Sequence, residues 1–114
     1  MAEYNFNNHK KGDTFPGAQF EVAIDGAPAQ LAGASIKMDV RRNNPSKTLL
    51  ITLSTTGSGI TITDEDNGIF IIDEQIIDIR AGTHIYDIEI TFADGTVKTY
   101  VEGTWTITQD VTYV

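Results

Sequence analysis

The stretch that decides the fold class reads HIYDIEITFADGTVKTYV, from His84 to Val101. Its apolar residues recur at every second position on both sides of Asp94-Gly95, and this period of two is typical of half-buried β-strands. Asp-Gly between two such runs predicts a hairpin with a two-residue turn, in which both turn residues take positive φ. Gly103 interrupts the return strand and predicts a bulge or a close approach of another backbone segment.

The same period of two continues along most of the chain. Alternating sets at residues 20–24, 36–41 and 49–53 are separated by turn residues, and this pattern is typical of an all-β sandwich or barrel with about 7–9 short strands. The run Ile69–Ile72 is apolar throughout and predicts a strand covered on both faces. Residues 73–80 fit a strand or a helical turn, and we interpret them as a short turn or helix-like linker.

Composition excludes several classes of function. The chain has 114 residues with 16 acidic and 8 basic side chains, so its formal charge is −8. This balance argues against nucleic acid and against anionic membrane surfaces as partners, because both need an excess of Lys and Arg. The absence of Cys rules out disulfides and thiolate chemistry. No apolar run approaches the length of a membrane span, and no signal peptide is visible at the N-terminus.

Residues with catalytic or metal-binding chemistry form no complete motif. Asp64-Glu65-Asp66-Asn67-Gly68 offers carboxylates to a hard cation, but Gln75 stands where a Ca²⁺-binding loop of the EF-hand type needs Glu. We interpret these residues as a solvated polar turn and leave cation binding open. His9 and His84 could act as general bases, but the sequence contains no Gly-x-Ser-x-Gly motif with a nucleophilic serine for them to activate. The sequence therefore predicts no catalytic residues, no cofactor and no metal site, and a protein that is not an enzyme.

Positive charge is concentrated in two short segments. Half of the basic residues lie between Lys37 and Lys47, and two more lie near the N-terminus, whereas acidic residues dominate the second half of the chain. One basic and one acidic end would suit head-to-tail contacts between subunits. An ordinary charged surface that keeps the protein soluble explains the pattern equally well. On charge and expected exposure, the candidate subunit contacts are Lys10, Lys11, Arg41, Arg42, Lys47, Val111 and Tyr113.

The order of turn and strand motifs resembles a known family. The motifs are Asp25-Gly26-x-Pro28, Asp66-Asn67-Gly68-Ile69-Phe70, Ala81-Gly82-x-x-x-Tyr86-Asp87-Ile88 and Gly103-x-Trp105-x-Ile107. Together they resemble the small immunoglobulin-like modules of tailed-phage virion proteins, such as the N-terminal domain of phage baseplate upper proteins. The resemblance implies an immunoglobulin-like antiparallel β-sandwich over residues 13–114, after a partly extended segment at residues 1–12.

The resemblance also implies a function. We expect a non-enzymatic structural component of a phage particle, made in the host bacterial cytoplasm and docked to other virion proteins in a homo- or hetero-oligomeric assembly. Baseplate upper proteins continue into helical or receptor-carrying regions, whereas this sequence ends at Val114, so a small accessory protein of the tail, neck, baseplate or capsid is favoured. The position in the particle, the copy number and the partner subunits stay open.

The alternative function is a small module that binds carbohydrate or a host surface. Such a module would stack sugar rings on exposed aromatic side chains, and Tyr100 and Trp105 are the candidates. A single Trp in a sandwich more often packs in the core, so we expect Trp105 to be buried.

Overall fold

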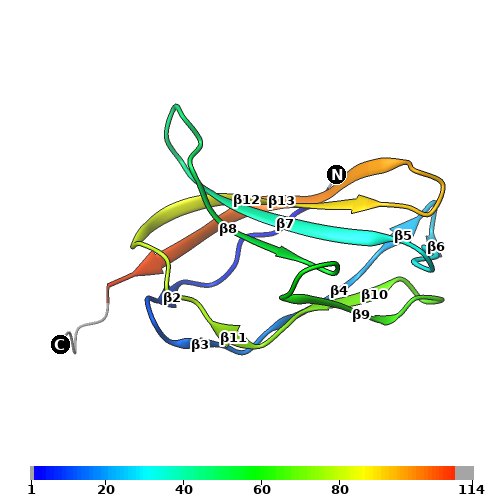
Figure 1. The fold of residues 1–114 in the computed structure, drawn as a ribbon, viewed down its shortest axis with the longest axis horizontal. Helices are drawn as coiled ribbons and strands as arrows, with labels where there is room; N and C mark the ends of the chain where they lie inside the picture. The colour runs from blue at the N-terminus through cyan, green and yellow to red at the C-terminus, as the bar shows by residue number, and fades with distance from the viewer. Residues whose placement is uncertain (1, 110–114) are drawn as a thin grey trace.

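The computed structural model describes residues 2–109, and these form an elongated all-β fold of 47 × 29 × 25 Å. Two sheets lie face to face as the layers of a β-sandwich (Figure 1). The predicted fold class is therefore confirmed. Seven of the strands are four or more residues long, in line with the expected number, and the others are two-residue pairings that join segments at the edges.

The larger sheet has the strand order β1-β13-β12-β7-β8, with β2 also paired to β13. Its strands are β1 (Ala2–Glu3), β2 (His9–Lys10), β7 (Ser35–Arg42), β8 (Leu49–Ser54), β12 (Gly82–Thr91) and β13 (Val97–Thr108). The smaller sheet has the order β4-β10-β9. It consists of β4 (Ala18–Glu21), β9 (Ile60–Asp64) and β10 (Ile69–Ile72). Two short ribbons pair β3 (Thr14–Phe15) with β11 (Gln75–Ile76) and β5 (Ala23–Ile24) with β6 (Ala27–Pro28).

The N-terminal segment belongs to the larger sheet. Both β1 and β2 run parallel to β13, and between them the Tyr4 and Phe6 amides donate to the carbonyls of Glu102 and Thr104. Close packing against β13 requires Gly103, because the Tyr4 carbonyl lies where a Cβ at that position would be. The close backbone approach expected at Gly103 is thus confirmed.

The hairpin between β12 and β13 closes differently from the prediction. The Gly95 amide donates to the Phe92 carbonyl at 2.9 Å, and the Phe92 amide donates to the Thr96 carbonyl at 2.8 Å. Gly95 has a φ of 92°, whereas Asp94 is not among the residues with positive φ. The turn is therefore a three-residue loop closed by one left-handed glycine, and the predicted two-residue turn is wrong. The Asp94 carboxylate accepts the Thr96 amide at 2.9 Å, a contact that Asp94 makes without a left-handed backbone.

Two further strand predictions need correction. Residues 73–80 contain no helical turn, because β11 pairs with β3 in an extended conformation. Burial alternates as in a strand at the end of β11, where Ile76 is 66% exposed and the next residue, Ile77, is fully buried. Strand β10 lies in the centre of its sheet, but only Phe70 and Ile72 are buried. Its other face is half-exposed because no further layer covers the smaller sheet.

The core lies between the two sheets and is richest in aromatic side chains near the N-terminal segment. Trp105 is fully buried, as expected, with its ring centroid 4.8 Å from that of Phe6 and 5.1 Å from that of Phe15. Phe6 also contacts Tyr86, with ring centroids 4.9 Å apart. The segment before β2 therefore closes one side of the core rather than lying outside it.

Candidate functional site

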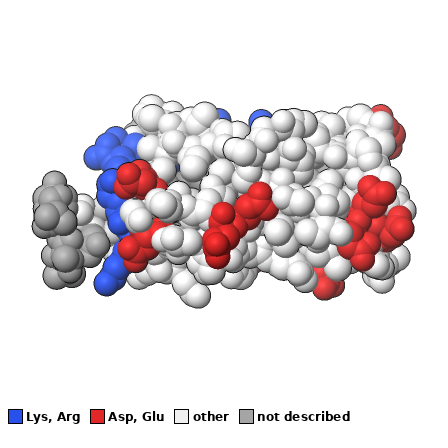
Figure 2. All heavy atoms as spheres, turned by 60° about the horizontal axis from the view of Figure 1, so that its bottom comes forward, with Lys and Arg blue, Asp and Glu red and all other residues white. Residues whose placement is uncertain are grey.

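Basic and acidic side chains are distributed unevenly over the surface. Figure 2 shows Lys and Arg together at the end of one face nearest β2, with some Asp and Glu beside them. The opposite end of that face carries Asp and Glu without Lys or Arg. The pairing of the strands explains this placement, because Lys10 lies beside Thr108 and Arg42 lies beside His84, at the same end of the larger sheet.

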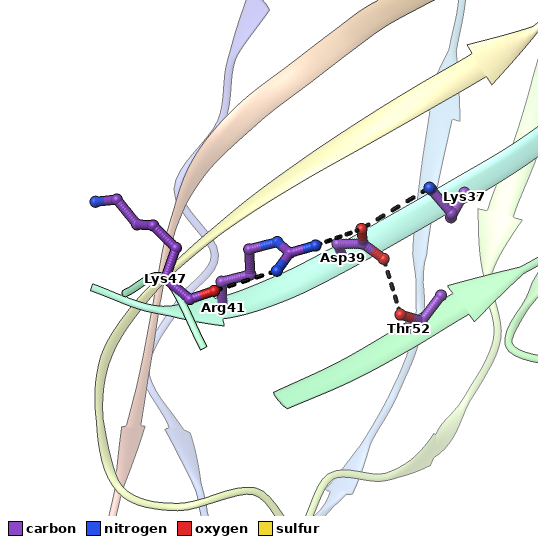
Figure 3. A network of polar contacts seen from close by, with 5 residues as sticks. All are labelled: Lys37, Asp39, Arg41, Lys47 and Thr52. Atoms are coloured by element: carbon purple, nitrogen blue, oxygen red, sulfur yellow. Dashed lines mark hydrogen bonds and ion pairs between the residues drawn. The ribbon is translucent and has the colours of Figure 1, made fainter. Parts of the chain in front are cut away.

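Arg41 and Lys47, predicted as subunit contacts, meet within one polar network (Figure 3). The Arg41 guanidinium donates to the Lys47 carbonyl at 3.1 Å and lies 3.4 Å from the Asp39 carboxylate. Lys37 lies 3.9 Å from the same carboxylate, and Thr52 donates to it at 2.8 Å. Asp39 therefore links β7 to the edge strand β8, and the Arg41 head group is held by its own chain.

The other predicted contact residues do not converge on this network. Lys11 forms an ion pair with Asp78 at 2.6 Å, on the segment that leads from β11 to β12. Lys10 and Arg42 lie on β2 and β7. Val111 and Tyr113 lie outside the described residues. The subunit contacts proposed from the sequence therefore stay predictions.

A row of carboxylates crosses the outer face of the larger sheet, and the sequence did not reveal it. Glu3 is paired with Glu102, Glu102 with Asp87, and Asp87 with Asp39, so four neighbouring strands each contribute one acid. Together with Arg41 and the side chain of Ile85, they line a hollow of about 250 Å³. Burial raises the pKa of the Asp87 carboxyl above 3.8, and the charges of Asp39 and Glu89 raise it further. Like charges on paired strands repel, so the row costs stability.

In the acidic turn between β9 and β10, the Asp64 carboxylate is hydrogen-bonded within the turn. Asp64 accepts hydrogen bonds from the Asn67 amide at 3.3 Å and from the Asn67 side chain at 2.8 Å. This geometry supports the interpretation as a polar turn. Across residues 2–109, no three His, Cys, Asp or Glu side chains converge to hold a metal ion.

Both histidine rings hydrogen-bond to main-chain carbonyls. The His84 Nε2 lies 2.7 Å from the Arg80 carbonyl, and the ring is 3% exposed. The His9 Nε2 lies 2.9 Å from the Asp13 carbonyl. Each ring is therefore hydrogen-bonded to a nearby segment of the backbone, and among residues 2–109 neither ring hydrogen-bonds to a hydroxyl group.

One flank of the sandwich carries few charged residues. Strand β8 borders only β7, and β9 borders only β10, so both are edge strands, and a short connection at residues 55–59 joins them on the same flank. The sequence from Thr48 to Thr63, which forms β8 and all of β9 except its last residue, Asp64, contains no charged residue. Leu49 at the start of β8 is 47% exposed. This flank differs from the two ends of the molecule, where the charged residues gather.

The main chain of β8 presents unpaired groups to solvent. The Thr55 amide donates to the Ile36 carbonyl, which makes Lys37 and Ser54 a pair without mutual hydrogen bonds. Bonded and non-bonded pairs alternate along an antiparallel ladder, so the amide and carbonyl of Thr52 point away from β7. Within residues 2–109 neither group has a hydrogen-bond partner. The edge of β8 is therefore open at Thr52.

Comparison with known proteins supports the fold and little beyond it. No family model matches the sequence, and no curated protein matches it. Among solved structures, the fold is similar to that of CopC from Methylosinus trichosporium OB3b, with a TM-score of 0.51 and 10% sequence identity over 94% of this chain and 89% of that chain. At this identity the likeness establishes a shared sandwich fold. In the described residues, no helix has the length and apolar character to cross a membrane.

The structure and this comparison correct the functions expected from the sequence. The likeness leads to CopC and not to a phage protein, which contradicts the expected role as a structural component of a virion. The carbohydrate-binding alternative fails on its own residues. Trp105, the only indole, is fully buried, and Tyr100 is half-buried with its hydroxyl bonded to the Glu21 carbonyl, so these residues do not form an exposed aromatic platform. Both interpretations are withdrawn.

Proposed function

We propose that this protein is a non-catalytic interaction module that binds a partner chain by adding one extended segment of the partner to the edge of β8. The single observation that carries the proposal is the open, charge-free edge of β8, with the amide and carbonyl of Thr52 unpaired. In this mode of binding, main-chain hydrogen bonds supply affinity and the alternating side chains supply specificity.

Apart from one bulge, the edge of β8 lacks the features by which most sandwich proteins prevent unwanted pairing. Edge strands are commonly protected by Lys, Pro, an inward-pointing charge or a bulge. Strand β8 reads Leu-Leu-Ile-Thr-Leu-Ser and has none of those residues. Its one bulge falls opposite the step from Val40 to Arg41, and the pairing from Ile51 to Ser54 is regular. A partner strand can therefore continue the larger sheet along this part of β8.

The side chains of β8 offer a different surface on each face of the sheet. On the inner face Ile51 is half-buried and Leu53 is buried, so an added strand would complete the cover of the apolar layer. On the outer face Thr52 is exposed and bonded to Asp39. A fitting segment therefore alternates a β-branched or apolar residue facing the core with a polar residue facing solvent.

The non-catalytic part of the proposal is supported by the state of the candidate catalytic groups. Both histidine rings are bonded to main-chain carbonyls, and the Asp64 carboxylate is bonded to Asn67. Among the residues that line the hollow on the outer face there is no histidine, serine or threonine, and the hydroxyl of Tyr86 is bonded to the Tyr4 carbonyl.

A surface-displayed library of linear peptides tests the proposal on the intact protein. The edge is blocked by Thr52→Pro, which removes the outward amide and leaves the bonds to β7 in place. The matched control is Thr52→Ala, which keeps the amide and removes the hydroxyl and the γ-methyl group. We expect the protein and Thr52→Ala to enrich the same extended, alternating peptides, and Thr52→Pro to bind them at least about tenfold more weakly. Equal binding to Thr52→Pro would contradict strand addition at β8.

A further inference from the structure

We infer that the segment added to β8 is β8 of a second copy of this chain, so that the two larger sheets join in a symmetric dimer. The inference rests on the proposed function, since it names the partner of the same edge. It follows from the hydrogen-bonding pattern of the edge, from the charges around it and from the apolar side chains left half-covered there.

The hydrogen-bonding groups of the edge are complementary to themselves. Two copies of β8 related by a twofold axis run antiparallel, as a closed dimer requires. With Thr52 opposite Thr52 of the second copy, each outward amide meets the outward carbonyl of the other chain. The pair then exchanges two hydrogen bonds, and the groups left unpaired in the single chain are satisfied. Pairs of Thr across strands are favourable in antiparallel sheets.

The charges allow two copies to approach along this flank. Each chain carries a formal charge of −8, so most relative orientations are repulsive. The flank formed by β8 and β9 has no charged residue between Thr48 and Thr63. The nearest charges on the larger sheet are those of Lys37, Asp39 and Arg41, in which both basic groups lie within 4 Å of the carboxylate and leave a net charge of only +1. Contact along β8 therefore avoids the repulsion that contact through the acidic end would bring.

The half-covered apolar side chains gain cover from the same contact. In the twofold register, Ile51 of one copy lies next to Leu53 of the other on the inner face of the joined sheet. Ile51 is half-buried in the single chain and Leu49 is 47% exposed. The regular part of the edge runs only from Ile51 to Ser54, so the buried area is smaller than the roughly 1,200 Å² of a stable interface. The dimer is therefore reversible and depends on concentration.

Sedimentation velocity over a wide range of protein concentration tests the inference. We expect the mass of the protein and of Thr52→Ala to rise from 12.5 kDa towards twice that value as concentration increases. We expect Thr52→Pro to stay at 12.5 kDa throughout. A protein that remains a monomer at the highest concentrations, or a Thr52→Pro variant that dimerises equally well, would overturn the inference.

Amide hydrogen exchange gives a second readout that needs no variant. The Thr52 amide points away from β7 and should exchange freely in dilute protein, then become protected as concentration rises. The Ile51 amide is bonded within the β7–β8 ladder and serves as the internal control, because it should be protected at every concentration. Free exchange at Thr52 in concentrated protein would contradict pairing at this edge.

The two experiments separate this inference from the proposed function. If the protein stays monomeric but peptides still bind in a manner blocked by Thr52→Pro, the edge binds a segment of another protein. The proposed function then holds, and only the inference that the partner is a second copy of this chain is wrong. If the protein dimerises and the dimer is insensitive to Thr52→Pro, the inference fails, and the proposed function stands or falls with the binding of peptides to Thr52→Pro. If neither dimer nor peptide binding is found, both proposals fail.

Discussion

The hydroxyl of Tyr86, in the middle of β12, donates a hydrogen bond to the main-chain carbonyl of Tyr4 in the N-terminal segment. The same carbonyl occupies the space beside Gly103 on β13, and Gly103 is the residue paired with Tyr86 of β12. Two neighbouring strands of the central hairpin therefore hold one peptide group of the N-terminal segment. This contact places Phe6 over Trp105 and closes the core on that side.

A methyl group at position 103 should displace the N-terminal segment. Because the Tyr4 carbonyl stands where the new Cβ would lie, Gly103→Ala must push the segment away from β13. We expect the free energy of unfolding to fall by about 1–3 kcal/mol, the usual cost of overpacking. Urea denaturation measures the change, with Thr106→Ala on the same strand as control. A Gly103→Ala variant as stable as the parent would disprove the close contact.

Removal of the Tyr86 hydroxyl should change both the stability and its dependence on pH. Tyr86→Phe leaves the Tyr4 carbonyl without this donor, at a cost of about 1 kcal/mol at pH 7. Burial, with a smaller contribution from Tyr4, raises the pKa of the Tyr86 hydroxyl far above its ordinary value of 10.0. The folded chain therefore keeps a proton that the unfolded chain loses, and stability falls as pH rises above 10.

The pH profile separates this effect from the lost hydrogen bond. Above pH 10, Tyr86→Phe should lose stability less steeply than the parent, because one of the two tyrosine hydroxyls whose pKa is raised in the folded chain is absent. A part of the slope should remain, since burial also raises the pKa of Tyr100. Identical slopes in chemical denaturation above pH 10 would show that the Tyr86 hydroxyl is not shielded in the folded chain.

Truncation of Phe6 should open the core to water at Trp105. Phe6 is 8% exposed, and its ring centroid lies 4.8 Å from that of Trp105. We expect Phe6→Ala to lower the free energy of unfolding by about 3 kcal/mol and to shift the Trp105 emission towards the red. Acrylamide quenching checks the access of solvent, with Tyr4→Ala, a partly exposed neighbour, as control. Emission that stays blue and unquenched in Phe6→Ala would place the cover of Trp105 elsewhere.

Neutralisation of Asp87 should stabilise the protein at neutral pH. Burial and the charges of Asp39 and Glu89 raise the pKa of the Asp87 carboxyl above 3.8, so the ionised form is disfavoured in the folded chain. The contribution of the Asp87 carboxyl to the free energy of unfolding therefore falls as pH rises past 3.8. We expect Asp87→Asn to gain on the order of 0.5 kcal/mol at pH 7, and the gain to vanish below pH 3.8.

Asp94 provides the control of opposite sign. The Thr96 amide lowers the pKa of the Asp94 carboxyl, so its ionised form is favoured in the folded chain. Asp94→Asn should therefore bring no gain at pH 7. Urea midpoints for both variants at pH 7 and pH 3 make the comparison, and a loss of stability in Asp87→Asn at pH 7 would refute the repulsion across the carboxylate row.

The local alternation of apolar and polar residues was sufficient to predict the strands, but not the turns between them or the layers that cover them. The alternation around His84 and Trp105 predicted the central hairpin and the burial of Trp105, because a strand presents successive side chains to opposite faces. The Asp94-Gly95 turn was predicted with the wrong length, since the Asp94 carboxylate can satisfy the Thr96 amide in more than one turn type. Ile69–Ile72 was predicted to be covered on both faces, and only the three-dimensional layers show that one face is half-exposed.

The sequence by itself determined an all-β fold and the position of its central hairpin, because these follow from the period of two, and the properties of glycine predicted a bulge or a close approach at Gly103. Only the tertiary structure decided which strands lie at the edges. It aligned Glu102, Asp87 and Asp39 across three strands and left the Thr52 amide without a partner among the described residues. Strand order depends on contacts between residues distant in the chain, and alternation along one strand carries no information about its neighbours.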